Sequence, residues 1–285
     1  PQLWPADLAL RAVSEQLVQP ESFRPTQVGV FLGEPGVEVP DPYFGGSGPA
    51  RSGCTFCGGC MVGCRHNAKN TLPKNYLHFA RRRGVQIVAR AQVRAIRPLP
   101  DGQADGARYA LEWGRVGAWG YGRAQELRAR NVIVAAGTLG TLQLLLRCRD
   151  QLLTLPRLSP HLGELVRTNS ESFVGSWSRQ PVADHSQGLA ISSIIRADET
   201  TQVETVRFPK GSSFLYWLLS TPLYDSGGGL LRRAFGLMGA ILRHPLDFLH
   251  SKLLPVLAQR TVEWMVMQTK ENRMRLRLGR GPWTL

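Results

Sequence analysis

The chain has 285 residues, of which 43% are hydrophobic and 20% charged, enough for one large or two ordinary globular domains. Its formal net charge of +14 comes mainly from arginine. Because the arginines do not gather in one run, we interpret the charge as scattered over solvated faces and expect no nucleic-acid partner. Five cysteines, four of them clustered, argue against a secreted disulfide framework, so we expect a reducing, cytoplasmic setting.

Residues 1–53 show two sequence patterns. Residues 1–20 predict an amphipathic helix. Residues 21–53 are rich in glycine and proline, which predicts a long ordered loop or a pair of short strands. The first residues show no signal-peptide pattern, and the longest uncharged run near the carboxyl end, 211–224, is too short to span a bilayer.

Residues 53–64 form a cysteine-rich loop in which Cys54, Cys57, Cys60 and Cys64 follow the spacing C-x2-C-x2-C-x3-C. This is the bacterial ferredoxin spacing for an iron–sulfur cluster, although Arg65 replaces the usual proline. Zinc also suits four close thiolates. A glycine-rich structural turn with small buried thiols is the third interpretation. We expect the four sulfurs to turn towards one point, with Cys148 apart from them.

The middle of the chain alternates short strands and helices. A helix is predicted to begin near Leu72, with Pro73 in its first turn, and to end at Gly84. Three short strands follow, at residues 85–88, 93–96 and 109–113. The apolar run 132–136 predicts a buried strand, after which Gly137 leads into a helix over about 138–148. Such a strand–helix junction offers a helix amino end to a phosphate, although any α/β domain contains similar turns.

The last third of the chain has a different hydrophobic pattern. Alternating patterns predict strands of an antiparallel sheet, at residues 189–195, 201–208, 261–268 and 274–278. Residues 230–257 are basic and amphipathic and contain two prolines. That pattern is typical of a segment that lies on an anionic membrane surface.

Three runs, at residues 54–77, 131–150 and 158–172, resemble the glucose–methanol–choline (GMC) oxidoreductases, most closely the bacterial cholesterol-oxidase-like branch, and in the same order. The resemblance implies an α/β fold. Residues 1–160 would form an incomplete, Rossmann-like FAD-binding domain, and residues 161–285 part of an antiparallel-sheet substrate domain. It also implies FAD as cofactor and an alcohol or sterol as substrate, with hydride passing to the flavin and the final electron acceptor unknown.

The resemblance also suggests cofactor contacts. In these enzymes the alanine–glycine turn lies against FAD, which implies contacts from Ala135, Ala136 and Gly137, while Val93 would present its backbone to the adenine. The family's opening G-x-G-x-x-G run and closing catalytic histidine segment are not found in the sequence. We therefore assign no catalytic residue, interpret the chain as an internal fragment, and expect it to be inactive when isolated.

Two other functions are compatible with the residues. One is an iron–sulfur electron-transfer protein without flavin. The other is a basic protein that binds membrane surfaces through residues 230–257. A cluster beside a flavin would let electrons leave to a separate acceptor, which would make the parent enzyme a dehydrogenase and not an oxidase.

Overall fold

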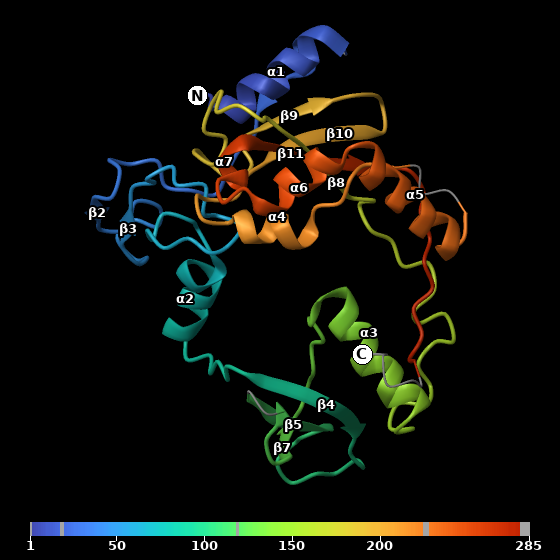
Figure 1. Cartoon of the computed structure of the whole chain (residues 1–285). Helices are drawn as coiled ribbons and strands as arrows, with labels where there is room; N and C mark the ends of the chain where they lie inside the picture. Colours follow the sequence, from blue (N-terminus) through green and yellow to red (C-terminus); the bar gives the residue numbers. More distant parts are fainter. Residues whose placement is uncertain (1, 18–19, 118–119, 225–227, 280–285) are drawn as a thin grey trace. The chain divides into compact units, whose positions relative to one another are not determined.

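The computed structural model describes residues 2–17, 20–117, 120–224 and 228–279. The chain divides into two compact units, each made from two stretches of sequence (Figure 1). The first comprises Pro1–Arg83 and Asn169–Lys270, and the second Gly84–Thr168 and Glu271–Leu285. These units do not coincide with the expected division at residue 160. That division concerns the domains of a longer parent, and it stays a prediction.

The first unit is built on a five-stranded antiparallel sheet. Its strand order is β1 (Arg24–Pro25), β9 (Ser193–Arg196), β10 (Thr201–Val206), β11 (Thr261–Gln268) and β8 (Ser172–Trp177). The antiparallel sheet expected in the last third is confirmed, and β1 joins it from near the amino end. The strand predicted at 274–278 is wrong. Met274 forms only an isolated bridge with Val166, because no described strand continues beside it.

Helices cover both faces of this sheet. Thr205 pairs with Trp264, so their side chains share the face on which Asp7 of α1 (Pro5–Leu17) accepts a hydrogen bond from Thr205. Glu263, one residue from Trp264, faces the opposite side. On that side lie α4 (Ser213–Leu219), α5 (Leu230–Arg243), α6 (Pro245–Leu253) and α7 (Leu257–Arg260). Helix α6 packs against both α4 and α5. Among the described helices, none is long and apolar enough to cross a membrane.

A buried ion pair fastens α1 to the sheet. Asp7 Oδ1 lies 3.0 Å from Arg207 Nη2, and both side chains are inaccessible to solvent. The hydroxyls of Ser192 and Ser193 also donate to Asp7, each at 2.6 Å. Burial alone would raise the pKa of Asp7, but Arg207 and these hydroxyls hold that pKa below its usual range.

The remainder of the first unit is mostly loop. Strands β2 (Glu38–Val39) and β3 (Arg51–Ser52) pair, which confirms the expected short strands, and a 3-10 turn spans Pro20–Ser22. The helix predicted near Leu72 is divided into a 3-10 turn, Leu72–Lys74, and helix α2, Tyr76–Arg82. Asn75 separates the two and caps α2 with its side chain. Gly84, with a φ of +87°, follows the end of α2.

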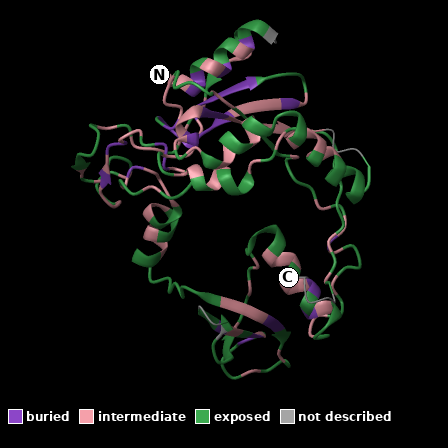
Figure 2. Cartoon of the chain, viewed as in Figure 1, coloured by how far each residue is buried: buried purple, intermediate pink, exposed green. Residues whose placement is uncertain are grey.

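The second unit packs one helix on a small antiparallel sheet. Its strands are β4 (Ala91–Pro98), β5 (Tyr109–Gly117), β6 (Gly120–Tyr121) and β7 (Gln125–Ala129), with β5 paired to each of the others. Helix α3 (Gly137–Asp150) lies against β4, and Cys148 Sγ accepts a hydrogen bond of 3.3 Å from the Ile96 amide. These contacts form the buried core of the unit (Figure 2).

Two predicted strands of this unit are wrong. Residues 85–88 and 132–136 are irregular, and Ile133 is 91% exposed. A strand needs hydrogen-bonded neighbours for its N–H and C=O groups, and no described strand pairs with either segment. Every strand pair among the described residues is antiparallel, so the structure is a mixed fold of helices and antiparallel sheets.

Candidate functional site

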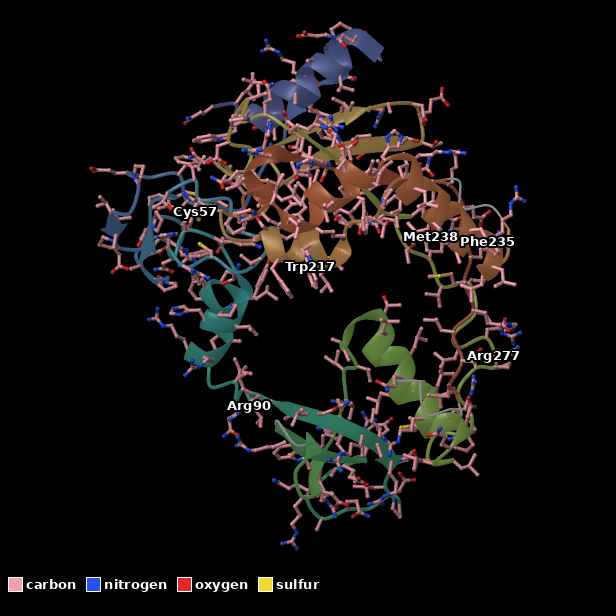
Figure 3. All side chains as sticks on the ribbon, viewed as in Figure 1. Cys57, Arg90, Trp217, Phe235, Met238 and Arg277 are labelled. Atoms are coloured by element: carbon pink, nitrogen blue, oxygen red, sulfur yellow. The ribbon has the colours of Figure 1, made fainter. Side chains whose placement is uncertain are left out.

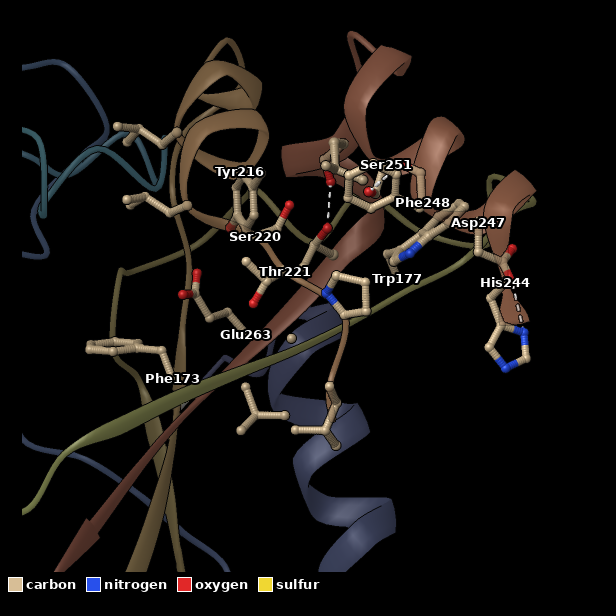
Figure 4. A pocket seen from close by; sticks show the side chains of 18 of the residues that line it. Phe173, Trp177, Tyr216, Ser220, Thr221, His244, Asp247, Phe248, Ser251 and Glu263 are labelled. Carbon is tan, nitrogen blue, oxygen red and sulfur yellow. Dashed lines mark hydrogen bonds and ion pairs between the residues drawn. The ribbon is translucent and has the colours of Figure 1, made fainter. Parts of the chain in front are cut away.

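A cavity of about 730 Å³ lies in the first unit between the sheet and the helices α4 and α6 (Figure 4). Phe173 and Trp177 of β8 and Thr261 and Glu263 of β11 line its floor. They share one face of the sheet because Trp177 pairs with Thr261 and because alternate residues of a strand face the same side. The volume falls within the range of about 300–1,000 Å³ that is usual for small-molecule sites.

Hydrogen bonds hold the helices over the cavity. Lys252 of α6 donates from Nζ to the carbonyl oxygens of Trp217, at 2.7 Å, and Ser220, at 2.6 Å. The Ser213 hydroxyl, at the start of α4, donates to the Pro255 carbonyl at 2.7 Å and accepts from the Ala258 amide at 3.2 Å. These hydrogen bonds fix α4 and α6 to each other, so the two helices form one layer that covers the cavity above the sheet.

One carboxyl group stands out in a lining that is mostly apolar. Glu263 is hydrogen-bonded to the Tyr216 hydroxyl, while its buried Oε2 has no partner among the described residues. Burial raises the pKa of Glu263 more than the bond from Tyr216 lowers it. Burial and the neighbouring Glu263 together raise the pKa of Tyr216. Glu263 therefore keeps its proton to a higher pH than an exposed glutamate does.

Three polar side chains, Asp247, His244 and Arg179, lie together at the more exposed end of the cavity. Asp247 of α6 accepts a hydrogen bond of 2.9 Å from Arg179 Nε, and its other oxygen lies 4.0 Å from His244 Nδ1. His244 is exposed and Asp247 half-buried. The cavity thus has an acidic hydrogen-bonding group at its floor and a charged group near solvent.

The four residues predicted to contact FAD all lie in the second unit. Val93 is half-buried in β4, opposite Trp113 and beside a β-bulge. Ala135, Ala136 and Gly137 are exposed, and Gly137 begins α3 with a φ of +69°. A Cβ at Gly137 would meet no atom within 4 Å, and the first turn of α3 carries no acidic side chain. A bare turn before a helix amino end fits an approaching phosphate-bearing cofactor.

The cysteines of the 53–64 loop surround a very small space. All four line one cavity of about 10 Å³, near Cys57 in Figure 3, whereas Cys148 is buried in the second unit. Yet in the described part of the chain no three histidine, cysteine or acidic side chains are placed to hold a metal ion. Cys54 and Cys64 instead pack in an apolar cluster with Val28, Val30, Phe56 and Leu189. The structure gives no support to an iron–sulfur or zinc centre.

Glycines explain the tight form of this loop. A Cβ on Gly58, whose φ is +68°, would lie 2.1 Å from the Ser186 carbonyl oxygen. A Cβ on Gly53 would lie 2.0 Å from the Glu34 carbonyl oxygen. The loop also joins the sheet region through the Gly58 amide, which donates to the Gly188 carbonyl at 2.9 Å. Close backbone packing is therefore a sufficient reason for the glycines, as expected if the 53–64 loop is a structural turn.

Sequence reasoning missed Glu263 and Tyr216. The available signal was a single acidic residue within the apolar strand T-V-E-W-M-V-M, since a charged residue in a buried strand needs a partner or a function. Tyr216, in the apolar run of α4, gave no comparable signal.

Comparison with known proteins agrees with the resemblance in the three sequence runs. Residues 50–148 match the GMC oxidoreductase family. The chain is 40% identical over 282 residues to a cholesterol oxidase of Acinetobacter baumannii, covering 97% of this chain and 50% of that protein. It is 42% identical over 230 residues to a cholesterol oxidase of Mycobacterium tuberculosis (strain H37Rv), covering 78% of this chain and 39% of that protein. The chain thus spans half or less of the length of these relatives. By these matches, residues 50–148 belong to the GMC oxidoreductase family.

Proposed function

We propose that the chain is part of an FAD-dependent enzyme that oxidises an alcohol with a large apolar body, such as a sterol. The observation that carries this proposal is the cavity of about 730 Å³ with a buried oxygen, Glu263 Oε2, for which the described residues offer no hydrogen-bond partner. A buried polar atom without a hydrogen bond is costly, and a single ligand hydroxyl would satisfy it. A large apolar molecule with one hydroxyl therefore matches the cavity, in agreement with relatives that are named cholesterol oxidases.

The chain's own residues would bind and orient the alcohol. Phe173, Trp177 and Phe248 would exclude water from its apolar body. Glu263, fixed by Tyr216, would hydrogen-bond the hydroxyl and set its position. We assign Glu263 to orientation of the hydroxyl, because its Oε2 is a buried oxygen that has no partner in the part of the chain that the structure describes. FAD, when bound, would accept the hydride that leaves the alcohol carbon.

We propose that Ala135, Ala136 and Gly137 contact FAD and that Val93 lies near its adenine. Their support is the open turn at Gly137 and the amino end of α3, where unpaired backbone N–H groups favour an anion. The exposed apolar Ile133 and Leu139 on either side of the turn are consistent with a surface that other parts of a longer protein cover. In that setting the 132–136 segment would join the Rossmann-like sheet that the family resemblance implies.

The cavity is tested by ligand binding. A fluorescent sterol should bind the protein in competition with cholesterol, and Glu263→Ala should weaken its affinity by about tenfold, the scale of one lost hydrogen bond. Glu204→Gln is the matched control, because Glu204 is a half-buried glutamate on β10 outside the cavity lining. Unchanged affinity in Glu263→Ala, or equal loss in the control, would contradict the assignment.

The flavin contacts are tested by flavin content. Gly137→Val in the full-length parent should lower bound flavin per mole of purified protein, because a branched side chain would fill the open turn. Gly106→Val is the control, since Gly106 also has a positive φ, +67°, and a Cβ there would likewise meet no atom within 4 Å. Normal flavin content in Gly137→Val, with a normal fold, would reject the contact.

The cysteine loop enters the proposal as a structural turn. An electron-transfer role would instead require a metal, and elemental analysis of an anaerobic preparation distinguishes the two. Several irons per chain with broad absorption at about 400 nm would restore the cluster hypothesis.

The inactivity of the isolated chain stays a prediction, tested with FAD, an artificial acceptor and a panel of alcohols. The cytoplasmic setting also stays a prediction, tested by cell fractionation.

A further inference from the structure

Four thiols of the first unit share one small space. Cys54, Cys57, Cys60 and Cys64 all line the cavity of about 10 Å³, which has room for about one water molecule (Figure 3 labels Cys57). All four are free thiols. Cys54 is buried, Cys60 and Cys64 are half-buried, and Cys57 is exposed. A small polar molecule can therefore reach the thiols from the side of Cys57.

A pair of thiols demands less of this geometry than a metal does. A zinc or iron–sulfur centre needs several sulfurs at bonding distance from the metal, and the described residues place no such group. A disulfide needs only two sulfurs, carried by residues whose Cα atoms lie within about 7 Å of each other. The loop can therefore support thiol chemistry between two of its cysteines without being a metal site.

Lys69 holds two of the four cysteines against itself. Its backbone amide donates to Cys64 Sγ at 3.5 Å, and its Nζ donates to the Cys60 carbonyl oxygen at 3.1 Å. Cys60 and Cys64 are four residues apart in the sequence and line the same cavity. The buried Cys54 Sγ accepts instead from the Phe56 amide at 3.4 Å. Cys60 and Cys64 are therefore the pair that these contacts bring together.

Positive groups lie beside the same two thiols. Arg207 is buried, and its Nε and Nη1 have no hydrogen-bond partner among the described residues. A Cys60 thiolate lies close enough to attract the Arg207 charge. Burial raises the pKa of the Cys64 thiol, but hydrogen bonds from backbone amides, that of Lys69 foremost, and the charge of Lys74 hold that pKa below its ordinary value. Reactive cysteines typically occupy such electropositive, partly exposed surroundings.

We propose that Cys60 and Cys64 form a dithiol that hydrogen peroxide oxidises to a reversible disulfide, with Cys64 as the attacking thiolate. In the first step an S–O bond forms at Cys64, the peroxide O–O bond breaks, and the departing hydroxide takes a proton to become water. Cys60 then attacks the sulfur of the Cys64 sulfenic acid, so that the S–S bond forms, the S–O bond breaks and a second water leaves.

The balance of this reaction is complete. Two thiols lose two protons and two electrons, and one hydrogen peroxide takes them up to give two molecules of water. The reaction stands on the contacts of the 53–64 loop alone. It requires neither the proposed alcohol oxidation nor the proposed flavin contacts.

Peptide mass spectrometry of the full-length parent tests the pair. The reduced protein is treated with hydrogen peroxide, its remaining thiols are alkylated, and trypsin is added. Cleavage after Arg51 and Arg65 releases residues 52–65, which contain all four cysteines of the loop. This peptide should lose two hydrogens and carry alkyl groups on Cys54 and Cys57 alone. Dithiothreitol added before alkylation should restore alkylation of all four thiols.

Two variants assign the roles, and a third is the matched control. Cys64→Ser should slow the oxidation of Cys60 by at least about tenfold, because the attacking thiolate is lost. Cys60→Ser should stop the reaction at the Cys64 sulfenic acid, which dimedone traps. Cys57→Ser should form the disulfide at the wild-type rate, because Cys57 is the exposed thiol of the same cavity and takes no part.

The position of the disulfide decides the proposal. A Cys60–Cys64 disulfide in the wild type and in Cys57→Ser supports it, as does a dimedone adduct on Cys64 in Cys60→Ser. These measurements suffice even if Cys64→Ser does not fold. A disulfide between any other two cysteines, a peptide that keeps its hydrogens, or loss of the disulfide in Cys57→Ser would overturn the proposal. Iron or zinc held by the four thiols of the purified protein would overturn it as well.

Discussion

Each face of the five-stranded sheet holds an acidic side chain, Asp7 buried and Glu263 half-buried, and their pKa values shift in opposite directions. On the α1 face, Asp7 accepts hydrogen bonds from the Trp4 amide, three hydroxyls and Arg207. On the cavity face, Glu263 has Tyr216 as its partner, and its Oε2 is unpaired within the described ranges of the chain. The pKa of Asp7 is lowered and that of Glu263 is raised.

Burial acts in the same direction at both sites, because desolvation disfavours any charged carboxylate. The difference therefore comes from the donors that each site supplies. Where hydrogen-bond donors and an arginine surround the carboxylate, as at Asp7, the ionised form of the side chain stabilises the folded protein. Where the donors are too few, as at Glu263, the carboxyl group stays protonated more readily and keeps an oxygen available for a ligand.

The largest effect is expected on the α1 face. Asp7→Ala should lower the free energy of unfolding by about 3–5 kcal/mol, because it leaves the Arg207 charge buried and without its partner. Urea unfolding followed by circular dichroism measures the change. Asp101→Ala, at an exposed turn, should change stability by less than about 0.5 kcal/mol. Similar losses in the two variants would contradict the buried ion pair.

The same carboxylate predicts acid lability. Because the folded pKa of Asp7 is lowered, its stabilisation is present above its ordinary unfolded pKa of about 3.9 and is lost as pH falls through the folded pKa. The wild-type protein should therefore lose stability below about pH 4 more steeply than Asp7→Asn. Parallel pH profiles of the two proteins would show that Asp7 is not the responsible group.

A smaller effect is expected from backbone packing next to Arg207. A Cβ on Gly188 would lie 2.3 Å from Arg207 Nη1 and 2.6 Å from the Trp4 ring, and its φ is +117°. Gly188→Ala should therefore cost about 2–4 kcal/mol in unfolding free energy. Gly211, before α4, has a φ of +95° but no atom within 4 Å of a Cβ, so Gly211→Ala should cost only about 1 kcal/mol. Equal losses of unfolding free energy in Gly188→Ala and Gly211→Ala would mean that the backbone is not packed more tightly at the α1 face than before α4.

Periodic segments were predictable from the sequence, whereas segments that depend on distant partners were not. Strand β11 and helix α3 follow local alternation and helical spacing, and both occur close to their expected positions. The apolar run 132–136 has an equally strong local pattern, yet it remains irregular because no described strand supplies its hydrogen bonds. Apolar character indicates a tendency to be buried, while pairing decides whether a strand forms.

The candidate site was harder to predict for the same reason. Tyr216 and Glu263 are far apart in the sequence and meet only when α4 lies over β11. In the 53–64 loop, the cysteine spacing is shared by metal centres and by compact turns. The contacts of Gly53 and Gly58 favour the turn, and a sequence pattern does not contain those contacts.

The smallest effect concerns the cavity face and depends on pH. The folded pKa of Glu263 is raised, so its favourable contribution is complete below its unfolded pKa of about 4.3 and is lost as pH rises through the folded pKa. A glutamine side chain would stay neutral at every pH, and Glu263→Gln should therefore match the wild type near pH 4 and exceed its stability by about 1 kcal/mol near pH 8. Urea midpoints across this range measure the difference, with exposed Glu112→Gln as the control. A difference that does not change with pH would mean that Glu263 is satisfied in the fold, and the cavity would then lose the oxygen that distinguishes it from the opposite face.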